Sequence, residues 1–181
     1  RRVASMSRSS RPCPTGFLID MDGVLFHGDR PLPGAADFLN WLRGRPHRFV
    51  TNNPIRSPRQ VAAHFRRLGL PSPDPAEVFT SADATAAYLS AQSGSPRFFA
   101  IGEGYLHTAL AGVGVSDDEN AEYVVVGEGP GLDYGTLTTA INLVAVNGAR
   151  LISTNPDANV DAHIDGRHRL LPGGGALAAA V

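Results

Sequence analysis

The chain has 181 residues, of which 43% are hydrophobic, and a formal net charge of −1 at pH 7. This size and composition suit a globular protein with its own core, and the charge balance argues against a nucleic-acid-binding surface. No run of about 18 apolar residues is present to cross a membrane. A single cysteine, Cys13, excludes an intramolecular disulfide and a thiolate metal site, so we expect a reducing, cytoplasmic setting. Residues 1–15 lack an apolar stretch, which predicts a disordered N-terminal segment rather than a signal peptide.

The first elements after this segment alternate between strand and helix. The apolar run Phe17 to Ile19 predicts a buried strand, and residues 34–44 carry apolar side chains at helical spacing. Residues 48–51 predict a second strand. Residues 57–69 predict a second helix, because a serine N-cap is followed by a proline and then a glutamine. This order predicts a parallel α/β sheet.

The second part of the chain predicts a smaller α/β unit of its own. Residues 78–94 predict a short strand followed by an alanine-rich helix. FFAIGEG (98–104) and YVVVGEG (123–129) are near copies that predict strands ending in Gly-Glu-Gly, and residues 151–157 predict another strand ending in Asn-Pro-Asp. Residues 133–149 predict a helix whose buried face is formed by Leu137, Ala140, Ile141, Val144 and Ala145.

Two aspartates, Asp20 and Asp22, directly follow the first predicted strand. An aspartate after a strand is often a turn former or a helix cap, and this interpretation stays open for either residue alone. However, Thr51 ends the next strand, and the carboxyl ends of parallel strands meet at the edge where open α/β sheets bind ligands. The topology therefore predicts two carboxylates and a hydroxyl at one site.

Two carboxylates this close require a cation between them or a shared proton. Mg²⁺ suits such a pair, since it commonly binds one or two carboxylates together with a substrate phosphate. One aspartate would then attack phosphorus while the other transfers the proton. Competing motifs are not met: Val24 and Leu25 stand where a calcium loop needs an acidic residue and a glycine, and no complete dinucleotide or phosphate-loop fingerprint occurs.

The motifs DMDGVL (20–25), TNNP (51–54) and TSA (80–82) together resemble haloacid dehalogenase (HAD) superfamily phosphatases, and in particular the subgroup of the NagD and p-nitrophenyl-phosphatase type. The resemblance continues through YVVVGEG, NGARLISTNPD and GGGALAAA. It implies a Rossmann-like parallel-sheet core, of which the N-terminal half is present, and an inserted α/β cap domain.

The resemblance also implies a division of the chain. Residues 16–94 would form the N-terminal part of the core and residues 95–172 the cap. Residues 173–181 would begin the returning core helix, with the remainder of the core absent.

Carried over onto this sequence, the resemblance implies a role for each motif residue. Asp20 would be the nucleophile and a Mg²⁺ ligand. Asp22 would be the general acid/base, and its backbone carbonyl would also face the metal. Thr51, Asn52 and Asn53 would bind the phosphate.

The Asn-Pro-Asp loop is harder to interpret. Asn155 and Asp157 are candidates for shaping the substrate pocket under the resemblance, but Asn-Pro-Asp is also an ordinary turn sequence, and we favour the turn. The family's third-motif lysine is not found, because all 16 basic residues are arginine. The fourth-motif acidic pair normally follows the cap, in a region that the 181 residues do not reach. Arg167 and Arg169 fall within the predicted cap, and a guanidinium does not replace an ammonium. We therefore expect the 181 residues to be a fragment of a phosphatase.

The expected function is a Mg²⁺-dependent phosphatase that hydrolyses a small phosphorylated metabolite through an aspartyl-phosphate intermediate. Two alternatives stay open: a non-catalytic fragment or binding remnant of the fold, and a phosphotransferase that uses the same aspartate. No nucleic-acid or membrane partner is expected. The substrate and the oligomeric state are left open, a homo-oligomer included.

Overall fold

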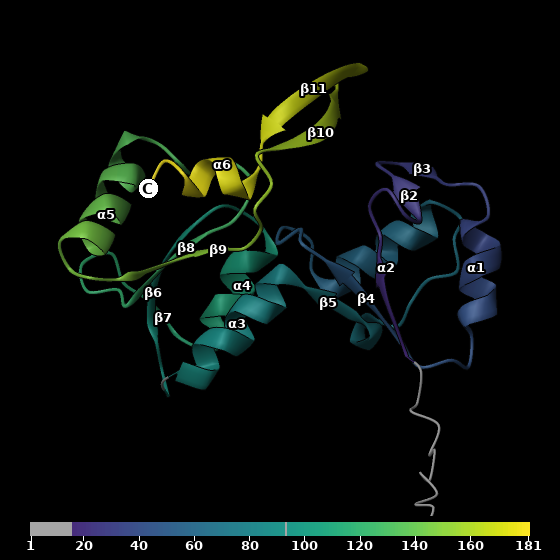
Figure 1. Cartoon of the computed structure of the whole chain (residues 1–181), viewed down its shortest axis with the longest axis horizontal. Coiled ribbons are helices and arrows are strands. Elements are labelled where there is room, and N and C mark those ends of the chain that lie inside the picture. Colours follow the sequence, from purple (N-terminus) through teal and green to yellow (C-terminus); the bar gives the residue numbers. More distant parts are fainter. Residues whose placement is uncertain (1–15, 93) are drawn as a thin grey trace, which may run out of the picture.

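The computed structural model describes residues 16–92 and 94–181, so the predicted disordered segment lies outside the described residues. Two units stand side by side, each built on a parallel sheet (Figure 1). Within the described ranges, no helix is both long and apolar enough to span a lipid bilayer. The α/β class and the parallel sheets predicted from the sequence are confirmed.

The first unit contains a three-stranded sheet with the order β1-β4-β5. Its core lies on one face of the sheet, where Ile19 and Phe49 pack against Leu39 and Phe65 of the covering helices. The elements are β1 (Phe17–Asp20), β2 (Phe26–His27), β3 (Arg30–Pro31), α1 (Ala35–Leu42), β4 (His47–Thr51), α2 (Pro58–Arg67), the 3₁₀ helix η1 (Pro75–Glu77) and β5 (Val78–Thr80).

Helix α2 begins as its sequence predicts. The Ser57 hydroxyl accepts a hydrogen bond from the Gln60 backbone N–H at 3.3 Å, and the Gln60 side chain accepts one from the Ser57 N–H at 2.8 Å. This capping box satisfies two N–H groups that the first helical turn leaves unpaired. It also fixes where the loop that leads out of β4 must end.

The second unit contains a four-stranded parallel sheet with the order β7-β6-β8-β9. Residues of α3 and α4 pack on one face and residues of α5 and α6 on the other. The elements are α3 (Ser81–Gln92), β6 (Arg97–Ile101), α4 (Tyr105–Ala111), β7 (Val115–Ser116), β8 (Tyr123–Val126), α5 (Tyr134–Ala145), β9 (Arg150–Ser153), β10 (Asn159–Ile164), β11 (Arg167–Pro172) and α6 (Gly174–Ala178).

Helix α3 follows β5 without a break but packs on the other unit. Its buried Ala82 and Leu89 belong to the same apolar cluster as Phe98 of β6 and Leu110 of α4. Figure 1 shows α3 beside α4, beneath the second sheet. The chain therefore passes from the first unit to the second at the junction of β5 and α3. The predicted domain boundary at residue 94 stays a prediction.

One detail of the second unit differs from the sequence predictions, and another was not predicted. The predicted face of α5 was wrong in part, because Ile141 is 40% exposed whereas Leu143 is buried against the sheet. Residues 159–172 form the antiparallel hairpin of β10 and β11, whose turn is Asp165-Gly166 with φ of 51° and 72°. Asp-Gly favours this turn because both residues tolerate positive φ.

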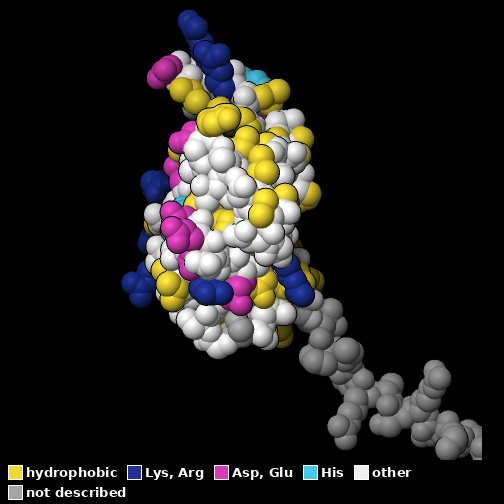
Figure 2. All heavy atoms as spheres, turned by 90° about the vertical axis from the view of Figure 1, so that its left-hand side faces the viewer, with side chains coloured by type: hydrophobic (Ala, Val, Ile, Leu, Met, Phe, Trp, Pro, Cys, Tyr) yellow, Lys and Arg dark blue, Asp and Glu magenta, His cyan; other side chains and the backbone are white. Residues whose placement is uncertain are grey.

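Neither charge sign dominates the face of the second unit shown in Figure 2. Hydrophobic side chains are interspersed there with arginine, acidic and uncharged ones.

Candidate active site

Asp20 lies at the edge of the sheet, where the first strand ends, and Asp22 lies in the tight turn that follows. Strand β1 ends at Asp20, whose Oδ1 accepts a hydrogen bond from the Met21 N–H at 2.8 Å. The Met21 carbonyl accepts from the N–H of Leu25 at 2.9 Å, and the Gly23 N–H donates to the Phe26 carbonyl at 2.7 Å. Gly23 has a φ of 75°, a conformation that favours glycine. This turn explains how two aspartates separated by one residue reach one site without sharing a strand face.

The second strand delivers Thr51, and a short loop after it is held by its own side chains. The Asn53 N–H donates to Thr51 Oγ1 at 3.1 Å, and Asn53 Oδ1 accepts from the N–H groups of Ile55 at 3.0 Å and Arg56 at 3.4 Å. We refer to residues 51–56 as the β4–α2 loop. Because Thr51 Oγ1 already accepts a hydrogen bond, its own proton points elsewhere and can be donated to a ligand.

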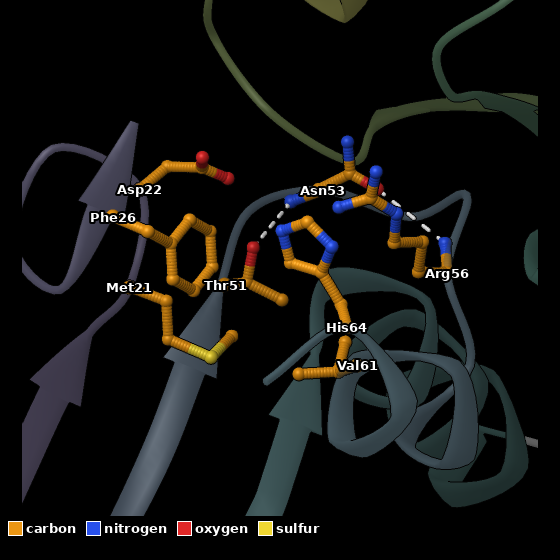
Figure 3. A pocket seen from close by; sticks show the side chains of 8 residues that line it. All are labelled: Met21, Asp22, Phe26, Thr51, Asn53, Arg56, Val61 and His64. Atoms are coloured by element: carbon orange, nitrogen blue, oxygen red, sulfur yellow. Dashed lines mark hydrogen bonds between the residues drawn. The ribbon is translucent and has the colours of Figure 1, made fainter. Parts of the chain in front are cut away.

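These residues line two adjoining cavities that share Thr51. Asp20, Thr51 and Asn52 line one of them, together with Thr80, Ser81 and Thr154. The other, shown in Figure 3, is lined by Met21, Asp22, Phe26, Thr51, Asn53, Arg56, Val61 and His64. The two carboxylates and the hydroxyl predicted from the sequence are therefore brought together at the carboxyl edge of the first sheet.

The carboxyl group of Asp22 faces the cavity of Figure 3, opposite Asn53, Arg56 and His64. The residue keeps contact with solvent, but surrounding protein atoms partly desolvate its carboxyl group and raise its pKa. The Arg56 charge opposes this rise, and the neighbouring Asp20 charge adds to it. The result is a carboxyl group that holds its proton to higher pH than an ordinary aspartate.

Arg56 and His64 were not predicted from the sequence as site residues. His64 is 1% exposed, and burial lowers its pKa, with the Arg56 charge acting in the same direction. Its Nε2 lies 3.1 Å from the Gly28 carbonyl and its Nδ1 lies 3.0 Å from Arg67 Nη2, which fits a neutral ring that donates to Gly28 and accepts from Arg67. An arginine in a loop and a histidine on a helix carry no sequence signal that distinguishes them from surface residues.

The second unit contributes a cluster of polar groups that form hydrogen bonds with the β4–α2 loop. Asn52 Nδ2 donates to Asp157 Oδ2 at 2.5 Å, and the Asn52 carbonyl accepts from Asn155 Nδ2 at 3.3 Å and from Ser81 Oγ at 2.7 Å. Asn155 Oδ1 accepts from the Asp157 N–H at 3.0 Å, so the Asn-Pro-Asp segment is also a turn, as favoured from the sequence. Neither Asn155 nor Asp157 lines the two cavities above, and their role in shaping a pocket stays a prediction.

Glu128 is a further polar group of this cluster and was not predicted from the sequence as a site residue. It is 4% exposed, its Oε2 accepts from Asn53 Nδ2 at 3.2 Å, and its Oε1 accepts from Asn155 Nδ2. Burial raises its pKa. The repeated Gly-Glu-Gly after β6 and β8 was the one sequence signal that pointed to it, since Glu128 is the middle residue of the second copy.

The donor set at the sheet edge fits Mg²⁺ but not a metal held by protein ligands alone. Asp20 and Asp22 are hard oxygen donors, and their mutual repulsion would be relieved by a cation. Among the described residues, no three histidine, cysteine, aspartate or glutamate side chains lie together in a way that could hold a metal ion. Two carboxylates that leave other positions to water and phosphate match the usual Mg²⁺ site.

Several known proteins with a similar sequence and fold are named as phosphatases. Residues 17–116 match the family model of the haloacid dehalogenase-like hydrolases. A protein of Staphylococcus aureus named acid sugar phosphatase is 40% identical over 169 residues, covering 91% of this chain and 63% of its own length. NagD of Escherichia coli K-12 superposes with a TM-score of 0.79 at 35% identity, covering 92% of this chain and 64% of that chain. The 4-nitrophenylphosphatase of Thermotoga maritima gives a TM-score of 0.78 at 30% identity, covering 91% and 62%.

The matches cover most of this chain but a smaller part of its relatives. The chain spans 63% of the length of the Staphylococcus aureus relative. The family model matches more than half of the chain and includes the Asp20 turn and Thr51. The chain belongs to the haloacid dehalogenase-like hydrolase family, in its NagD-like subgroup.

Proposed function

We propose that the protein is a Mg²⁺-dependent phosphatase that hydrolyses a small phosphorylated metabolite through an aspartyl-phosphate on Asp20. The observation that carries the proposal is the meeting of Asp20, Asp22 and Thr51 in two cavities that share Thr51. The names of the relatives, acid sugar phosphatase and 4-nitrophenylphosphatase, support a phosphate monoester as the substrate.

In the first step, Asp20 attacks the phosphorus atom of the substrate. Its Oδ1 is engaged by the Met21 N–H, which leaves Oδ2 as the attacking atom. The bond between phosphorus and the leaving oxygen breaks, and Asp22 donates its proton to that oxygen. The raised pKa of Asp22 suits this role, because a general acid must be protonated at the working pH.

In the second step, water attacks the phosphorus atom of the aspartyl-phosphate. The Asp22 carboxylate accepts a proton from the water, the bond between Asp20 and phosphorus breaks, and inorganic phosphate leaves with Asp20 restored. Through both steps the Thr51 hydroxyl would donate to a phosphoryl oxygen, because its own lone pair accepts from the Asn53 N–H. The backbone N–H of Asn52 would donate beside it.

The Asp20 carboxylate and the Asp22 backbone carbonyl would hold the metal ion at the sheet edge. Bound Mg²⁺ supplies positive charge that screens the approach of a carboxylate to an anionic phosphoryl group. Arg56 adds a fixed positive charge across the cavity from Asp22.

The test is turnover of p-nitrophenyl phosphate by the purified protein, with MgCl₂ and after treatment with EDTA. We expect EDTA to abolish turnover and MgCl₂ to restore it. We expect Asp20→Asn to lower kcat by at least about 10³-fold, because removal of a nucleophile eliminates the covalent route. Circular dichroism checks that the variant is folded.

Three results would count against the proposal. Near wild-type turnover by Asp20→Asn would show that another group is the nucleophile. An inactive wild-type protein would favour the non-catalytic alternative. Transfer of the phosphoryl group to an added alcohol in preference to water would favour the phosphotransferase.

A further inference from the structure

Glu128 is a buried carboxylate at the carboxyl end of β8, and neither step proposed above uses it. It is 4% exposed, and its hydrogen-bond donors are the side-chain amides of Asn53 and Asn155. Within residues 16–92 and 94–181, no arginine or histidine forms an ion pair with it. A buried carboxylate without a cation is costly, so its retention requires a reason.

The two carboxylate oxygens of Glu128 join loops that come from different units. Oε2 accepts from Asn53 Nδ2 of the β4–α2 loop, 75 residues earlier in the chain, at 3.2 Å. Oε1 accepts from Asn155 Nδ2 of the loop after β9, and the same Nδ2 reaches the Asn52 carbonyl at 3.3 Å. Glu128 is therefore the point at which the second unit holds the Asn53 side chain.

Both polar atoms of the Asn53 side chain are held by this arrangement. Its Oδ1 accepts from two backbone N–H groups of its own loop, and its Nδ2 donates to Glu128. With the side chain fixed, the Asn53 N–H points at Thr51 Oγ1, 3.1 Å away. A continuous set of hydrogen bonds thus runs from Glu128 through Asn53 to the Thr51 hydroxyl (Figure 3 shows the last link).

We propose that Glu128 is a positioning residue of the active site, which acts through Asn53 to orient the Thr51 hydroxyl toward the transferring phosphoryl group. The inference rests on the proposed phosphatase function. It gives the second unit a direct part in the chemistry at the first sheet, although Glu128 itself does not touch the reacting atoms. The two amides contact different oxygens of Glu128, an arrangement that a carboxylate accepts without turning a donor toward either amide.

The test compares Glu128→Gln with Glu122→Gln. Both glutamates flank β8: Glu128 follows its carboxyl end, whereas Glu122 precedes its amino end, is exposed and accepts from the Arg97 N–H at 3.0 Å. A glutamine at 128 keeps one acceptor and turns an N–H₂ donor toward a second donor, so one of the two amide contacts is lost. Glutamine at 122 leaves the active-site hydrogen bonds unchanged.

For the purified protein with p-nitrophenyl phosphate and MgCl₂, we expect Glu128→Gln to lower kcat about 10-fold and to change KM far less. A misdirected donor weakens the stabilisation of charge in the transition state more than it weakens substrate binding. Glu122→Gln should retain wild-type kcat. In an Asn53→Ala background, Glu128→Gln should cost almost nothing further, because its route to Thr51 is already cut.

Hydrogen exchange gives a second measurement that does not depend on turnover. We expect amides of residues 51–56 to exchange faster in Glu128→Gln than in the wild type or in Glu122→Gln. Unchanged exchange in this segment overturns the inference, even if the protein is a phosphatase. So does a full additional loss of kcat from Glu128→Gln in the Asn53→Ala background. An inactive wild type with faster exchange in the variant would instead overturn the proposed function and leave the loop contact established.

Discussion

Gly104→Ala is expected to loosen the contact between the two units beside the β4–α2 loop. Gly104 precedes helix α4 with φ of 70° and ψ of −134°, a conformation that is essentially restricted to glycine. A Cβ added there would lie 2.9 Å from Ile55 Cγ2 and closer still to the Ile55 carbonyl oxygen. That carbonyl accepts a hydrogen bond from the Tyr105 N–H at 2.8 Å, so the added methyl group would push apart the two segments that this bond joins.

The expected loss in the free energy of unfolding has two parts. The backbone conformation costs an alanine roughly 1–3 kcal/mol. Relief of the overlap requires Ile55 to move, which weakens the bond to Tyr105 and costs about 1 kcal/mol more. The sum is about 3 kcal/mol.

The matched control is Gly148→Ala. Gly148 also has positive φ, 77°, but nothing lies within 4 Å of the position of an added Cβ. This variant should carry only the conformational cost of an alanine in the left-handed region, about 1 kcal/mol. The difference between the two variants, about 2 kcal/mol, corresponds to roughly 4–8 °C in Tm for a chain of this size.

Thermal and urea unfolding of the wild type and both variants measure this difference, and turnover is measured on the folded variants. Gly104→Ala should also lower kcat, because Ile55 belongs to the loop that carries Thr51. If the two variants unfold within about 0.5 kcal/mol of each other, the close approach of Gly104 to Ile55 does not exist in solution and the reasoning fails.

Two further predictions concern the same loop and the helix after it. Arg56→Gln removes the positive charge that lowers the pKa of Asp22, so that pKa rises and the general acid stays protonated to higher pH. The alkaline limb of the pH profile of kcat/KM should therefore move to higher pH. The control is Arg59→Gln at an exposed position, and an Arg56→Gln profile that overlays those of the control and the wild type would contradict the prediction. Ser57→Ala removes the N-cap of α2 and should lower the free energy of unfolding, measured in urea, by about 1 kcal/mol. The control Ser90→Ala, on the exposed side of α3, should leave the free energy of unfolding almost unchanged. Equal losses in the two variants would show that the capping box contributes no stability.

The sequence predicted the parts of the site that local rules determine. The strand ending at Asp20 followed from an unbroken apolar run, and the start of α2 at Pro58 followed from the capping pattern. Between them, the parallel topology placed Asp20 and Thr51 at one edge. These features depend on residues that are neighbours in the sequence, or on one strand-helix-strand crossover.

The rest of the site depends on contacts between distant residues, which carry no local signal. Glu128 meets Asn53 across 75 residues, and Asp157 meets Asn52 across 105. The α5 prediction failed in part for a related reason: Ile141 is apolar and correctly spaced, yet Leu143 packs against the sheet in its place, beside the predicted Ala140. Periodicity gives the existence of an apolar face but not the rotation at which the helix docks.

The contacts around the β4–α2 loop indicate that the position of the second unit and the geometry of the loop are coupled. Four separate segments of that unit hold the loop: Ser81 at the start of α3, the Tyr105 N–H at the start of α4, Glu128 after β8 and Asn155 after β9. A displacement of the unit that admits a substrate must break some of these bonds, and each broken bond frees part of the loop that carries Thr51. If the proposed phosphatase chemistry is correct, the Thr51 hydroxyl is correctly directed only when the second unit sits against the loop. Substrate entry and alignment of the phosphate-binding groups would then be successive states of the same contact, which is a way to confine phosphoryl transfer to a closed, water-poor site.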